Sequence, residues 1–169
     1  MQRLLTVIAL GMTLSAPTSF AADYPDEIEA SRETVKEFMQ TLEKELQSSM
    51  QAGGPVNAVS VCNLTAPAIA NTYSARNGWE VGRTSLKLRN PNNAPDAWER
   101  AVLETFEQRK LAGEDPAQME FHEVVRVDGE KQLRYMKAIP TSRPCLACHG
   151  EALDSIVKTR LETLYPHDQ

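Results

Sequence analysis

The stretch MEFHEVVRVDGEKQLRYMK, residues 119–137, decides the fold class because it joins two strand-like runs through one tight turn. Asp128 and Gly129 sit between the runs, and Asp-Gly is favoured where both central residues of a two-residue hairpin turn need a positive φ. Strand alternation places Phe121 and His122 on opposite faces. We therefore predict an antiparallel β-hairpin here.

Helical patterns precede the hairpin. Residues 26–51 form an amphipathic helix that Gly53-Gly54-Pro55 should end. Its apolar stripe recurs every three or four residues: Ile28, Val35, Phe38, Met39, Leu42, Leu46 and Met50. A second helix follows up to Asn77-Gly78, with Cys62 on its inward face and Pro67 kinking or restarting it.

The rest of the chain completes an α+β order. Residues 79–88 suggest a short strand, and a third helix should follow, capped by Asn93 with Asp96 in a capping-box-like position. A last helix is expected over residues 153–164. The predicted fold is a small antiparallel sheet covered by helices, with a long N-terminal helix.

The first residues, MQRLLTVIALGMTLSAPTSFAA, read as a secretory signal peptide over residues 1–21. Residues 22–169 would then form one exported, periplasmic domain, with no membrane span in the mature chain. Lys and Arg number 18 against 23 Asp and Glu, a net charge of −5. This acidic balance argues against a nucleic-acid partner.

The motif PCLACHG, residues 144–150, allows three chemical interpretations. A zinc site would need further paired ligands, which the chain does not offer at the usual spacing. A redox dithiol would be expected within a βαβ pattern, which is absent. Cys-x-x-Cys-His is the attachment pattern of c-type haem, and export agrees with it. Cys145 and Cys148 would form thioethers, and His149 would bind the iron.

The second axial ligand stays open on the residues alone. Met119, Met136, His122, His167 and Cys62 are available. The methionines resemble ordinary core residues, and the histidines resemble surface or tail residues. Cys62 is either a small buried residue or a ligand.

Three runs in order, AVSVCNLTAPAIA, GWEVGRTSLKLRNPNNAPDAWE and the approach to PCLACHG, resemble a family of exported PAS-like single-haem c-type domains. That family includes a cyanobacterial soluble haem protein and sensor modules of histidine kinases. The resemblance implies a PAS-like sheet and one covalent haem c held by His149 and Cys62. Arg83 and Arg89, in the family-like RTSLKLRN run, become the expected propionate contacts. Family members continue beyond the YPHDQ segment, so their last strand is expected to be absent here.

Two functions follow from this resemblance, and neither is enzymatic. Electron transfer to a redox partner protein suits an iron with both axial positions filled. The alternative is a redox or gas sensor that works through a partner such as a sensor kinase. A haem-free ligand-binding module is the third possibility, and the intact motif argues against it.

Overall fold

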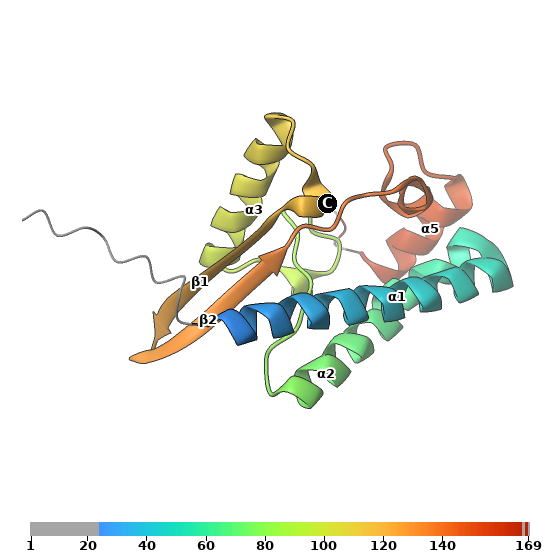
Figure 1. The fold of residues 1–169 in the computed structure, drawn as a ribbon. Helices are drawn as coiled ribbons and strands as arrows, with labels where there is room; N and C mark the ends of the chain where they lie inside the picture. The colour runs from blue at the N-terminus through green and yellow to red at the C-terminus, as the bar shows by residue number, and fades with distance from the viewer. Residues whose placement is uncertain (1–23, 167, 169) are drawn as a thin grey trace, which may run out of the picture.

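The computed structural model describes residues 24–166 and 168, and it has an α+β fold with a long N-terminal helix, as predicted. The predicted signal peptide at residues 1–21 lies outside the described residues. The main elements are α1 (Pro25–Ser60), α2 (Ala66–Asn77), α3 (Ala97–Leu111), β1 (Glu120–Val127), β2 (Glu130–Lys137), α4 (Leu146–His149) and α5 (Ser155–Leu164). Figure 1 shows α1 running from the hairpin at one end of the molecule to α5 at the other.

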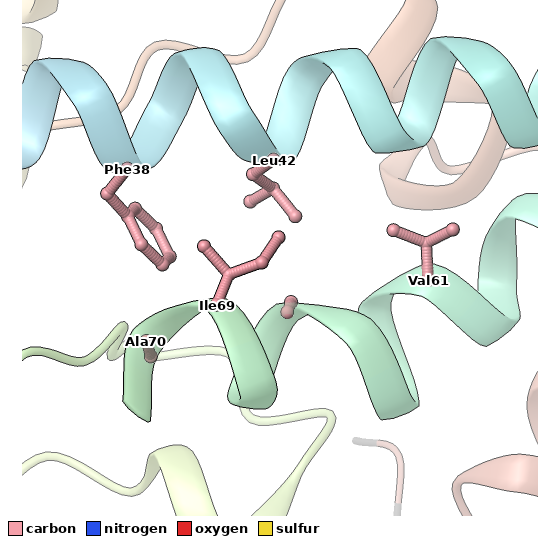
Figure 2. Packing of buried hydrophobic residues seen from close by; sticks show 6 residues of the cluster. Phe38, Leu42, Val61, Ile69 and Ala70 are labelled. Carbon is pink, nitrogen blue, oxygen red and sulfur yellow. The ribbon is translucent and has the colours of Figure 1, made fainter. Parts of the chain in front are cut away.

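The helices α1 and α2 pack side by side through the predicted apolar stripe. Phe38 and Leu42 of α1 are buried against Ile69 and Ala70 of α2, as Figure 2 shows. The backbone of α1 is non-helical at Gly53 and Gly54, where a break was expected, although the helix resumes as far as Ser60. The apolar periodicity therefore predicted the buried face, and the Gly53-Gly54-Pro55 sequence predicted the position of the break.

A single turn of π-helix, η2 (Val61–Thr65), joins α1 to α2. It carries Cys62, and Pro67 lies in the first turn of α2, which agrees with the predicted restart. Gly78 ends α2 with a left-handed φ of 71°. The π-turn itself was not expected from the sequence, and such turns often occur at functional sites.

The hairpin forms as predicted. β1 and β2 pair antiparallel, with Val124 opposite Leu133, and the turn residues Asp128 and Gly129 have φ values of 52° and 86°. Just before β1, Met119 is 1% exposed and packs with Val102 and Phe106 of α3. The residue that leads into the hairpin is therefore buried against α3.

Two predictions of local structure are wrong. Residues 79–88 form no strand, and their polar groups bond outside any strand ladder: the Val81 N–H donates to Ser74 Oγ of α2 at 2.9 Å, and Thr84 Oγ1 donates to the Asn93 carbonyl at 3.0 Å. The cap of α3 is Asp96 rather than Asn93, with a reciprocal capping box to Glu99.

The described sheet has two strands, so the antiparallel sheet is smaller than the PAS-like sheet that the resemblance implies. The closing helix α5 packs against the end of α1 through Val59, Val157 and Leu161. Among the described residues, no helix combines the length and apolar character needed to cross a membrane.

Candidate functional site

The CxxCH motif forms one compact helical turn. A 3₁₀ turn, η5 (Arg143–Cys145), leads directly into α4, which ends at His149. All three cysteines of the structure carry free thiols and are half-buried. Because Cys145 and Cys148 are three residues apart in a helical segment, their side chains project from the same face. His149 follows immediately and is exposed to solvent.

Gly150 ends this turn at a place where no side chain fits. Its N–H donates to the Leu146 carbonyl at 3.0 Å. A Cβ on Gly150 would lie 2.5 Å from the same carbonyl oxygen. The glycine thus lets the chain turn back closely after His149.

Cys62 lies beside this turn although it is far away in the sequence. Burial raises the pKa of its thiol, Arg83 and Arg89 oppose that shift, and Cys145 adds to it. These influences place Arg83, Arg89 and Cys145 near the Cys62 thiol. The fold therefore gathers the predicted site residues from η2, from the 78–96 connection and from the CxxCH turn.

The two arginines differ in their partners. The Arg89 Nε donates to Asp168 Oδ2 at 2.9 Å, and both side chains are largely shielded, at 22% and 28% exposure. Arg83 is half-buried and makes no ion pair with another described residue. An anionic group entering the site would find Arg83 available and Arg89 shared with Asp168.

The site favours a neutral imidazole at His149. Although the residue is exposed, desolvation by the surrounding protein lowers the pKa of its imidazole. Arg89 and Arg83 lower the pKa further, while Asp168 partly raises it. A neutral imidazole has the free nitrogen lone pair that binding to iron requires.

The other candidate ligands lie elsewhere or outside the described residues. Met119 and Met136 belong to the core between α3 and the hairpin, as predicted. His122 is half-buried on β1, opposite Tyr135 in the strand register. His167 lies outside the described residues.

Two residues of the site were missed by sequence reasoning. Tyr165 is 5% exposed and lies near Cys62. Burial raises the pKa of its phenol, and Cys62 raises it further. Asp168 pairs with Arg89. Both residues belong to the final YPHDQ segment, and no periodicity in the sequence indicates that this segment lies at the site.

The donor chemistry fits a covalently bound haem. Two free thiols and one imidazole share a single helical turn, a third thiol lies beside it, and two arginines provide positive charge. Two thiols and a histidine at this spacing are the attachment pattern of c-type haem, the third thiol offers a further ligand, and the arginines offer positive charge for the propionates. Among residues 24–166 and 168, no cluster of three His, Cys, Asp or Glu side chains is arranged to hold a metal ion directly.

These features define a small α+β protein in which a CxxCH turn lies beside a third cysteine. The family model described as Tll0287-like, Tll0287, matches residues 21–169. The chain therefore belongs to the Tll0287-like family. No curated protein and no solved structure matches the chain.

Proposed function

We propose that this chain is a periplasmic c-type haem protein that transfers electrons. The observation that carries the proposal is the position of Cys62 near the CxxCH turn, although the two are more than 80 residues apart in the sequence. Cys145 and Cys148 would hold the porphyrin through thioethers. His149 and Cys62 would bind the iron. We also propose that the domain is related to PAS domains.

Each residue has a distinct task in this arrangement. Haem, when bound, supplies a one-electron iron couple. Arg83 and Arg89 would bind its propionates, with Asp168 competing for Arg89. Cys62 would donate negative charge as a thiolate, which favours ferric iron and lowers the reduction potential. Because Cys62 and His149 would fill both axial positions, substrate would have no open coordination site, in keeping with electron transfer to a redox partner.

Covalent attachment tests this proposal directly. We expect the protein produced together with a c-type haem attachment system to keep its haem after acid-acetone extraction. Cys145→Ser and Cys148→Ser should each lose one thioether, and the double variant should release all haem. Cys62→Ser is the matched control, because it removes a thiol from the same site and should keep both thioethers. Colourless protein, or complete extraction of haem from the unsubstituted chain, would refute the proposal.

The π-turn favours a second candidate, a haem-based redox or gas sensor. Cys62 lies within η2, which connects α1 directly to α2, so a change in ligation at Cys62 would act on both helices. A partner protein such as a sensor kinase would then read that movement. Carbon monoxide added to the reduced protein separates the two functions: an unchanged spectrum supports the carrier, whereas displacement of Cys62 supports the sensor.

A further inference from the structure

The outer edge of β1 is open along its length. The described sheet consists of β1 and β2, so each strand has one paired side and one outer edge. On the β2 side, α1 lies against the strand. Among the described residues, no backbone hydrogen bond from outside the hairpin reaches residues 120–127. The hairpin also projects beyond the helices at its turn, as Figure 1 shows.

The turn determines which backbone groups of β1 point outward. Asp128 and Gly129 both have a positive φ, which is the type I′ geometry of a two-residue hairpin loop. Val127 and Glu130 are then the hydrogen-bonded pair that closes the turn. Because hydrogen-bonded and non-hydrogen-bonded pairs alternate along antiparallel strands, every second residue of β1 directs its N–H and C=O outward. These residues are Glu120, His122, Val124 and Arg126.

This edge lacks the features that usually keep strand edges from pairing. The eight residues of β1, EFHEVVRV, include no proline and no lysine, and their register with β2 contains no bulge. Phe121 and Val127 stay 38% and 40% exposed, although Phe121 also lies against Trp98. β2, in contrast, carries Lys131 and Lys137. A long, regular edge with exposed apolar side chains is suited to pairing with another strand.

A second copy of β1 fits the edge in one register. Two identical edges related by a two-fold axis pair antiparallel, so each register is centred on one residue of β1. A centre at Val124 places Phe121 opposite Val127 of the second copy, and this pairing covers both exposed side chains. A centre at Glu123 would place two carboxylates opposite each other. A centre at Val125 would place Phe121 opposite the turn residue Gly129.

The charges of β1 are complementary in the register centred on Val124. Arg126 then lies opposite His122 of the second copy and diagonal to its Glu120, and diagonal neighbours are within reach of long side chains. Within one chain, the Arg126 guanidinium donates to the Gly129 carbonyl at 3.2 Å and forms no ion pair with a described residue. The two-fold axis repeats this contact, so each copy supplies a cation to the other.

We propose that this chain forms a two-fold symmetric dimer in which β1 pairs antiparallel with β1 of a second copy, centred on Val124. The two hairpins then make one four-stranded antiparallel sheet in which the outward N–H and C=O groups of β1 are paired. The dimer rests on the strand edge alone and does not depend on haem.

A matched pair of lysine variants tests the dimer. Sedimentation velocity of the purified protein is measured up to about 0.5 mM, because interfaces of this size are often weak. Val124→Lys should raise the dissociation constant of the dimer at least about tenfold, since it places two like charges at the two-fold axis. Leu133→Lys is the control, because Leu133 pairs with Val124 on the same face but belongs to the other strand. Circular dichroism checks that both variants keep their helices.

Hydrogen exchange gives the second readout without any substitution. Residue-resolved exchange by NMR is compared at low and high protein concentration. We expect the amides of His122, Val124 and Arg126 to gain protection as the concentration rises, whereas those of Glu123 and Val125, already bonded within the hairpin, should change little. A protein that stays monomeric throughout, equal weakening by the two lysine variants, or no added protection along β1 would overturn the inference.

Discussion

Gly150 is the residue on which the shape of the CxxCH turn depends most directly. Gly150→Ala should destabilise the haem-free chain by about 1–3 kcal/mol, because the new Cβ would meet the Leu146 carbonyl oxygen at 2.5 Å and force the turn apart. Urea denaturation measures the loss. Gly82→Ala is the control, since a Cβ there meets nothing within 4 Å. Equal stability of the two variants would show that the close approach at Gly150 is unimportant.

Glu120 ties the start of α1 to the hairpin. It accepts hydrogen bonds from Arg32 Nε at 3.1 Å and from the Tyr135 hydroxyl at 2.8 Å. These bonds lower the pKa of Glu120 from 4.5 to about 2, and the bond from Arg32 contributes most. Glu120→Gln should cost about 1 kcal/mol at neutral pH, a modest value because the ion pair is partly exposed.

The pH dependence of this contribution has a definite sign. A carboxyl group whose pKa is lower in the folded state stabilises the protein above its unfolded pKa, and that stabilisation fades as pH falls toward the folded value. The difference between Glu120→Gln and the unsubstituted chain should therefore shrink between about pH 4.5 and pH 2. Glu29→Gln, which removes a more exposed partner of Arg32, should show little effect. A difference that stays constant through this range would contradict the assignment.

At the scale of elements, the N-terminus of α3 shows how local chemistry selects a boundary. Asp96 accepts from the Glu99 N–H at 2.8 Å, Glu99 Oε2 accepts from the Asp96 N–H at 2.9 Å, and Arg134 donates to Asp96 at 2.6 Å. Asp96→Ala should cost about 1–2 kcal/mol in thermal or urea unfolding. Asn93→Ala should be nearly neutral, because no side-chain bond of Asn93 caps the helix. A larger loss of stability in Asn93→Ala than in Asp96→Ala would indicate that Asn93 is the cap.

Elements with strong periodicity or a specific turn signal could be predicted from the sequence. The α1 stripe, the Asp128-Gly129 hairpin and the Gly78 helix end all depend on neighbours in the chain. The connection at 79–88 could not be predicted in this way. Its Val81 N–H and Thr84 hydroxyl donate hydrogen bonds to Ser74 and Asn93, and strand alternation in the sequence carries no information about these contacts. The π-turn at Val61–Thr65 also has no signal in apolar spacing.

At the scale of the whole molecule, the fold brings together segments whose proximity no local pattern could establish. The CxxCH turn could be found from its motif, and Arg83, Arg89 and Cys62 were expected at the site through resemblance. Asp168 and Tyr165 were not expected, because their roles arise only when the last segment lies near Cys62 and Arg89. Figure 1 shows α4 and α5 together at the end of α1, which is the arrangement that creates this meeting.

The identity of the second axial ligand tests the central claim most directly. The measurement is the optical spectrum of the oxidised, haem-loaded protein, compared with Cys62→Ala and with His122→Ala as the control at another candidate ligand. We predict a low-spin, thiolate-ligated ferric spectrum that Cys62→Ala abolishes and His122→Ala preserves. A Cys62→Ala spectrum identical to that of the unsubstituted protein would contradict the account, because the thiol beside the CxxCH turn would then be no ligand.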